Sequence, residues 1–448
     1  MAISERKLIP LRQQKVGPPA DQRVVTEIYR PFFLAGILSV LTAGCLLGAV
    51  ALLGIAIQGS YTASAWTPYV LAHANSQLYG WVGFFVIGFA LQQHAPRQSR
   101  SDLFHRMAAW SLGLMAVGIG LRFAAEPLVR VDPTIWMPVG IASCLLQAMA
   151  IGIFMLTIRM TRFNTGEGLS WQTGFVYVAL FWWSLVALAE PFFFAQSHGP
   201  GGVAFVAKWF SPYREAQFLG FVAMMIFGVA LVKLSSCFGA KAACPVLGRA
   251  GLAVWNVGLL LRMTGWVLHA DSDFTNPMLW YVGGLLIFAG AVILVLASRL
   301  FSRLGSELRS HKFIRAAFGW LLVSGLLLVL EPLHLVAIGD VFSHAYTGAI
   351  RHAVTVGFIS QMIVGVSLHV VARMNDLDDR RLPSLWSVFW LLNLGNAARV
   401  GLEIATDYSG SAFLPMGVTG FVELTALLIW AVHVAKPMLS RPSPAHVS

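Results

Sequence analysis

Two histidines stand near the start of long apolar segments, each a few residues ahead of a glycine. His73 precedes Gly80 by seven residues, and His352 precedes Gly357 by five. A neutral imidazole is the usual axial ligand of heme iron, and two imidazoles from facing helices can hold one heme between them. We therefore predict that His73 and His352 are heme and metal ligands. The alternative for each is an ordinary polar residue at the end of an apolar helix.

The directions of the two side chains limit this hypothesis. At 100° per residue of α-helix, His73 points within about 20° of Gly80, whereas His352 points about 140° from Gly357. The two rings can meet only if their helices turn different faces toward a shared cavity. His369, on the same segment as His352 but near its other end, is a third candidate metal ligand.

Three arginines form a second set of candidates, because ionisable side chains at membrane depth are costly and mark functional sites. Arg122, Arg262 and Arg399 each follow a glycine by four residues. Glu126 and Glu403 follow two of these arginines by four residues, which favours structural ion pairs on one helix face. The alternative is that the arginines bind heme propionates, which accept bidentate guanidinium contacts. Three more carboxylates lie at membrane depth: Glu190, Glu331 and Glu423. Glu423 could carry protons or be a neutral structural group.

The elements that must position these side chains are long and apolar. Of the 448 residues, 57% are hydrophobic and 11% charged, and the mean hydropathy is +0.71, which is too apolar for the surface of a soluble protein. A bilayer core about 30 Å thick needs roughly 20 apolar residues per helix. The sequence predicts an all-α polytopic membrane protein with about twelve such helices: 31–57, 70–92, 105–126, 135–158, 172–195, 214–234, 248–269, 278–299, 313–336, 347–372, 385–404 and 412–435.

The distribution of positive charge predicts the orientation of these helices. With the N-terminus inside, 24 of the 31 lysines and arginines fall on cytoplasmic segments and 7 on the opposite side. This asymmetry is the one that the positive-inside rule describes, so the net charge of +11 is no sign of nucleic-acid binding. We predict a bacterial inner-membrane protein with cytoplasmic tails at 1–30 and 436–448 and one membrane domain at 31–435.

Glycines and arginines recur at a fixed period. Gly80, Gly220 and Gly357 are each followed by a glycine eight residues later and by an arginine 42 residues later. Two markers in register predict three equivalent four-helix repeats, at about 31–158, 172–299 and 313–435, around a central axis. The glycines would serve close helix packing in such repeats. The period disfavours a transporter built from two halves of six helices.

Several of these segments together resemble the NnrS family of membrane proteins. Tyr29-Arg30-Pro31-Phe32-Phe33 is similar to the family's Arg-Pro-Phe-Phe opening. His73-Ala74-Asn75-Ser76 resembles its His-Ala-His-Glu segment, and His352-Ala353-Val354-Thr355-Val356-Gly357 its His-Ala-Leu-x-x-Gly segment. The resemblance covers most of the chain. It implies a heme- and copper-containing inner-membrane protein linked to nitric oxide and denitrification, with His73 and His352 at positions of family histidines.

The departures from the family pattern bear on the metal. Asn75 and Ser76 replace the family's second histidine and its acidic residue, and Arg373-Met374-Asn375-Asp376 stands where the family has Gly-His-Thr-Gly-Arg. The residues therefore support heme, of the b type, more than copper. The threefold plan also resembles the catalytic subunit of heme-copper oxidases, but the segment 214–234 carries no histidine, so a full oxygen-reducing centre is not expected.

The leading functional hypothesis is a heme-binding membrane protein that senses, binds or reduces nitric oxide or another small diatomic ligand. The alternatives are a transporter or channel whose repeats enclose a polar path, and an assembly factor for respiratory enzymes. Besides the lipid bilayer, a respiratory-chain protein is a candidate partner. The sequence leaves open whether the chain is an enzyme.

Overall fold

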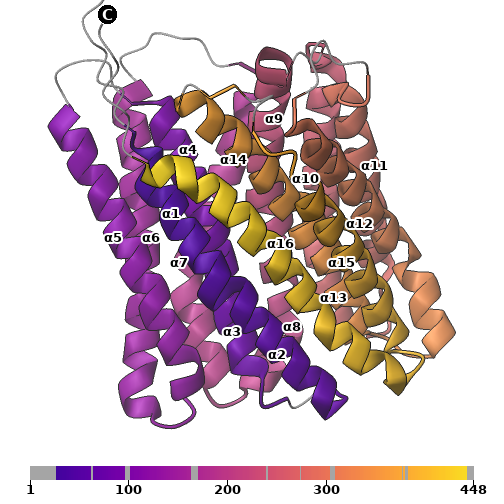
Figure 1. Ribbon diagram of the computed structural model, residues 1–448. Helices are drawn as coiled ribbons and strands as arrows, with labels where there is room; N and C mark the ends of the chain where they lie inside the picture. Colours follow the sequence, from indigo (N-terminus) through magenta and orange to yellow (C-terminus); the bar gives the residue numbers. More distant parts are fainter. Residues whose placement is uncertain are drawn as a thin grey trace, which may run out of the picture.

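The structure is a computed structural model, which describes residues 27–61, 64–95, 101–162, 170–238, 241–272, 274–302, 308–375, 377–378 and 382–440. The predicted tails lie mostly outside these residues. Helix is the regular secondary structure throughout the described chain (Figure 1). The α-helices are α1 Tyr29–Ser39, α2 Cys45–Gln58, α3 Thr67–Asn75, α4 Phe84–Gln93, α5 Ser101–Leu128, α6 Pro133–Arg162, α7 Thr173–His198, α8 Gly202–Glu215, α9 Ala223–Phe238, α10 Pro245–Asp271, α11 Met278–Ser298, α12 His311–Ile338, α13 His344–His352, α14 Gln361–Met374, α15 Trp386–Ala405 and α16 Phe413–Leu439.

Short π-helical turns join several of these into longer helices. They are η1 Val40–Gly44, η2 Ser76–Gly83, η3 Ala216–Val222 and η4 Ala353–Ser360. Within the described residues, ten helices are long and apolar enough to cross a membrane. Two further helical stretches, 67–93 and 386–405, lie where the sequence predicts a second and an eleventh span. The chain is thus a multi-pass helical membrane protein, and the count of twelve spans stays a prediction.

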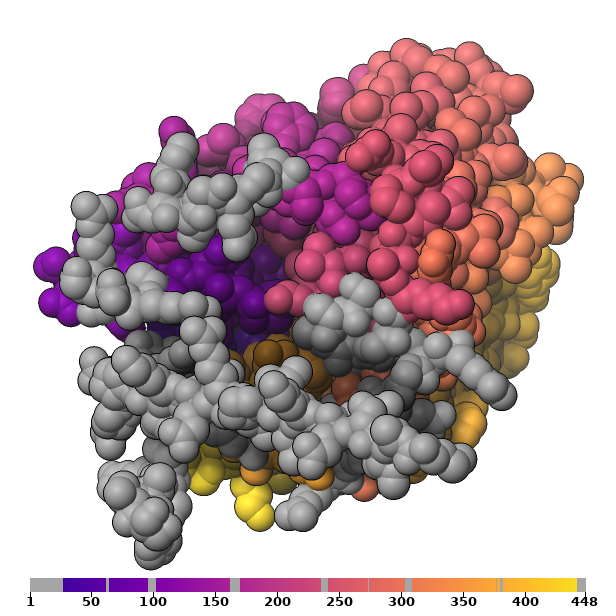
Figure 2. All heavy atoms as spheres, turned by 90° about the horizontal axis from the view of Figure 1, so that it is seen from above, coloured from indigo at the N-terminus to yellow at the C-terminus, as the bar shows by residue number. Residues whose placement is uncertain are grey.

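The helices pack on one another in chain order around the molecule. α5 packs on α6, α6 on α7, α10 on α11, α11 on α12 and α15 on α16, and α16 returns to α2. Figure 2 shows the same order from above, with the colours running around the molecule from indigo through magenta and orange to yellow. Large apolar side chains such as Trp110, Leu188 and Val336 are exposed on the outside. Such a surface fits contact with the apolar lipid tails of a bilayer.

Two of the long helices lie in the interior of this arrangement. In the helices 202–234 and 344–374, 72% of the most apolar stretch is buried, against 33–50% in the other eight. The stretch 67–93 joins them there, because the Trp81 indole donates a hydrogen bond to Ser360 Oγ at 3.2 Å. Interior helices can turn side chains toward the centre of the molecule, whereas the outer ones must present apolar surface to lipid.

The three repeated glycines lie in π-helical turns. Gly80 is in η2, Gly220 in η3 and Gly357 in η4, and these turns begin 140 and 137 residues apart, the same intervals as the glycines. A Cβ on Gly220 would lie 2.7 Å from Trp182, and one on Gly357 would lie 2.5 Å from Trp320. The prediction that these glycines serve close helix packing is confirmed. π-helical turns insert a residue into a helix and often occur at functional sites.

Candidate functional site

His73 lies near the end of α3, three residues before η2 begins, and its ring faces the start of α2. Its Nδ1 is 2.8 Å from the carbonyl oxygen of Gly44 and, because a carbonyl can only accept, Nδ1 donates this hydrogen bond. The ring also packs on Gly48, where a Cβ would lie 2.5 Å from Nδ1 and Cε1. Two glycines of the first helix therefore hold this imidazole in place, and its Nε2 takes no part in that hydrogen bond.

His352 is the last residue of α13 and has a similar arrangement. Its Nδ1 donates to the carbonyl oxygen of Gly348 at 2.9 Å and lies 3.2 Å from Glu403 Oε2. Both contacts are made by Nδ1, and neither involves Nε2. Metal-binding histidines commonly donate one ring N–H to a carbonyl or carboxylate, which fixes the ring and leaves the other nitrogen as the ligand.

His73 packs against α2, and His352 contacts Glu403 on α15. Since α16 packs against both α2 and α15, the two candidates lie on elements that meet around α16. The regular helix geometry used above placed them on different faces. That estimate does not extend across a π-helical turn: η4 begins directly after His352, and η2 begins three residues after His73. The extra residue in such a turn changes the direction of every side chain before it relative to those after it.

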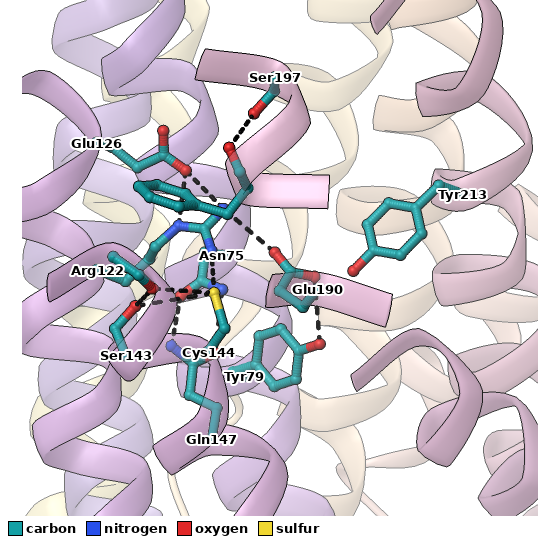
Figure 3. Close-up of polar contacts among 12 residues, drawn as sticks. Asn75, Tyr79, Arg122, Glu126, Ser143, Cys144, Gln147, Glu190, Ser197 and Tyr213 are labelled. Carbon is teal, nitrogen blue, oxygen red and sulfur yellow. Dashed lines mark hydrogen bonds and ion pairs between the residues drawn. The ribbon is translucent and has the colours of Figure 1, made fainter. Parts of the chain in front are cut away.

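Arg122 sits in a buried polar cluster (Figure 3), which Asn75, two residues after His73, joins through Gln147. Its guanidinium is 2.6 Å from Glu126 Oε1 on α5 and 3.3 Å from Glu190 Oε1 on α7, and Nη1 is 2.6 Å from Cys144 Sγ on α6. Glu190 also accepts a hydrogen bond from the Tyr79 hydroxyl at 3.4 Å. Four helices are thus tied together through one arginine.

The other two predicted arginines are also paired. Arg262 lies 2.7 Å from Glu215 and 2.8 Å from Glu331, and Arg399 lies 2.9 Å from Glu403. All three arginines are therefore engaged by the protein's own carboxylates, as the ion-pair interpretation requires. Their role toward heme propionates stays a prediction, and only Arg399 keeps two guanidinium nitrogens, Nε and Nη1, buried without a hydrogen-bond partner among the described residues.

Asn75, Glu215 and His352 occupy the same register on the three interior helices, 140 and 137 residues apart. Each bonds to an outer helix that follows it in the chain. Asn75 exchanges hydrogen bonds of 3.1 and 3.2 Å with Gln147, Glu215 pairs with Arg262, and His352 pairs with Glu403. One position of the predicted repeat therefore holds an amide, a carboxylate and an imidazole.

One predicted residue, His369, lies apart from this centre. His369 follows His352 by 17 residues on the same helix, which places it roughly 25 Å away at 1.5 Å per residue. It cannot share a metal ion with His73 and His352, and the described residues contain no group of three or more His, Cys, Asp or Glu side chains placed to hold a metal ion. Glu423 is buried on α16, and its Oε1 has no hydrogen-bond partner within the described part of the chain.

The sequence reasoning missed two kinds of residue. Gly44, Gly48 and Gly348, which position the imidazoles, carry no signal in a single sequence. Arg214 and Arg351 do carry one: they are 137 residues apart, the interval between Gly220 and Gly357, and each directly precedes one of the central polar residues.

The fold and the site together define a multi-pass helical membrane protein with a buried, strongly polar centre at one end. The model of the NnrS family, described as NnrS protein, matches residues 24–443, nearly the whole chain. The chain belongs to the NnrS family, as the resemblance of its motifs predicted. No curated protein matches it.

Proposed function

We propose that this protein binds heme through His73 and His352 and acts in the nitric oxide response or in denitrification-linked redox chemistry. The observation that carries the proposal is the common arrangement of the two imidazoles. Each donates Nδ1–H to a glycine carbonyl, each has Nε2 outside that bond, and the two lie on elements that meet around α16. Bis-imidazole ligation needs these three features.

The remaining residues fit a heme in part. Arg399, with two unbonded guanidinium nitrogens beside Glu403, could accept a propionate, and Arg122 and Arg262 could do so only by giving up carboxylate contacts. Bound heme would supply an iron able to take a diatomic ligand such as nitric oxide. The link to nitric oxide comes from the family resemblance, and copper has no three-ligand site among the described residues to support it.

An absorption spectrum of the detergent-solubilised protein from heme-replete cells tests the proposal. We expect a Soret band, a pyridine hemochrome spectrum of b type, and loss of both in His73→Ala and His352→Ala. His433→Ala is the matched control. His433 Nδ1 also donates to a carbonyl four residues back, that of Ile429 at 2.7 Å, but His433 lies near the C-terminal end of α16. A colourless wild-type protein, or equal heme content in all variants, would contradict the proposal.

The finer architecture belongs to the same proposal. We propose twelve membrane spans in three four-helix units, arranged as in heme-copper oxidases and placed in a bacterial inner membrane with both termini cytoplasmic. The recurrence of the π-helical turns at the period of the glycines supports the three units. The competing hypotheses, a transporter or channel and a respiratory assembly factor, predict substrate flux in heme-free protein and co-purification with a respiratory enzyme, respectively.

A further inference from the structure

A small cavity lies between two of the interior helices, beside the candidate heme ligands but separate from them. α8 and η3 line it on one side, and α13 and η4 line it on the other. Its volume is about 40 Å³. Its charged lining consists of Arg214, Glu215, Arg262 and Arg351, among apolar side chains such as Leu219 and Val354. Three of its four charged groups are thus cations.

Two of these cations have no carboxylate partner. Five carboxylates contact other arginines: Glu126 and Glu190 contact Arg122, Glu215 and Glu331 contact Arg262, and Glu403 contacts Arg399. Arg214 is 8% exposed, and its described hydrogen bond runs from Nη1 to Gln217 Oε1 at 2.7 Å. For the Arg351 guanidinium no hydrogen bond or ion pair is found within the described residues. Arg262 Nη1, also at the cavity, is buried without a hydrogen-bond partner there.

An unpaired guanidinium inside a membrane protein is unfavourable, since it loses its hydration and gains no counter-charge. Arg214 and Arg351 line the same small cavity, so their like charges repel each other, and Glu215, Glu331 and Glu403 act on Arg351 only from beyond ion-pair contact. Because the two occupy the same register on neighbouring interior helices, they approach the cavity from its two sides. An anion between them would relieve both the lost hydration and the repulsion.

The size and the donors select the kind of anion. One water needs about 10–15 Å³ of such space, so a cavity of 40 Å³ holds about three waters or an ion of three to four heavy atoms. The planar guanidinium donates two parallel hydrogen bonds to a planar oxyanion. Glu215, at the cavity wall, disfavours a divalent anion. We propose that this cavity binds one small planar monovalent oxyanion, of the size of formate or nitrate, between Arg214 and Arg351. The proposal does not depend on heme.

Titration of the purified, full-length, heme-free protein in gluconate buffer tests this proposal. We expect sodium formate and sodium nitrate to raise the midpoint of thermal unfolding in a saturable way, with a binding heat in calorimetry, and sodium sulfate at equal ionic strength to do neither. Arg351→Gln and Arg214→Gln should each weaken binding at least tenfold. Arg130→Gln, an exposed arginine beyond α5 at the same end of the molecule, should leave binding unchanged.

The stability of the variants separates binding from a structural role. Removing a cation that has no ion-pair partner should leave the unfolding midpoint in gluconate unchanged or raise it, whereas a structural arginine would lower it. The proposal is overturned by equal effects of sulfate, by undiminished binding in both glutamine variants, or by a lowered midpoint of Arg351→Gln in gluconate. Loss of formate binding on loading with heme would assign these arginines to a heme propionate, and would also overturn the proposal of a free anion.

Discussion

Gly48 fits tightly against the imidazole of His73 in the candidate site, and Gly48→Ala tests this contact directly. The new Cβ would lie 2.5 Å from Nδ1 and Cε1 of the ring, so the imidazole must retreat by about 0.9 Å to reach an ordinary contact of 3.4 Å. A shift of this size away from α2 also lengthens the 2.8 Å hydrogen bond to Gly44. Overpacking of this kind costs about 1–3 kcal/mol.

A double-mutant cycle with His73→Ala isolates this contact. In the wild-type background Gly48→Ala should lower the free energy of unfolding by about 1–3 kcal/mol, measured by equilibrium unfolding in a sodium dodecyl sulfate titration. In the His73→Ala background the ring is gone, so the same substitution should cost close to nothing. Gly120→Ala on α5, where a Cβ meets nothing within 4 Å, is the control and should be neutral in both backgrounds. An equal cost of Gly48→Ala in both backgrounds would refute the geometry described here.

The same substitution bears on heme. If the displaced ring loses about 1–3 kcal/mol of ligand binding, the affinity for heme should fall about 5- to 150-fold. Titration of heme into heme-free protein, followed at the Soret band, measures this. Suppose that the double-mutant cycle shows coupling between Gly48 and His73, but the Gly48→Ala variant binds heme as tightly as the wild type. The packing contact would then be real, and the role of His73 as a heme ligand would be refuted.

Three further predictions follow from other parts of the structure. Arg262→Gln leaves the buried Glu331 and the partly buried Glu215 unpaired, so it should lower the free energy of unfolding by about 3–5 kcal/mol in the same titration. A change below about 1 kcal/mol would contradict a buried ion pair. Trp81→Phe removes the hydrogen bond to Ser360 and should cost about 0.5–1.5 kcal/mol, whereas in a Ser360→Ala background, where that bond is already absent, the same substitution should cost close to nothing. For the orientation, a green fluorescent protein fused after Ser448 should fluoresce and an alkaline phosphatase fused after Asp340 should be active, and the opposite pattern would reverse the predicted topology.

The amino-acid sequence by itself determined the membrane character, the family and the repeat of markers. Apolar segments of about twenty residues are a local property, because a helix in lipid must satisfy its own backbone hydrogen bonds. The glycines eight apart could likewise be read as packing positions. A Cβ at Gly228 or Gly365 would lie 2.7 Å from Val176 or 2.9 Å from Ile314, so these glycines do admit a neighbouring helix.

Only the tertiary structure decided which side chains meet. A helical wheel drawn through His352 and Gly357 assumes an unbroken α-helix, and the π-helical turn between them invalidates that assumption. The partners of the imidazoles are backbone carbonyls, which every residue has, so Gly44 and Gly348 could not be singled out beforehand. The same holds for charge. A sequence shows arginines and carboxylates at similar depth, but the placement of the helices in space decides which of them pair. It also decides that Arg214 and Arg351 face a cavity without a carboxylate in ion-pair contact with either.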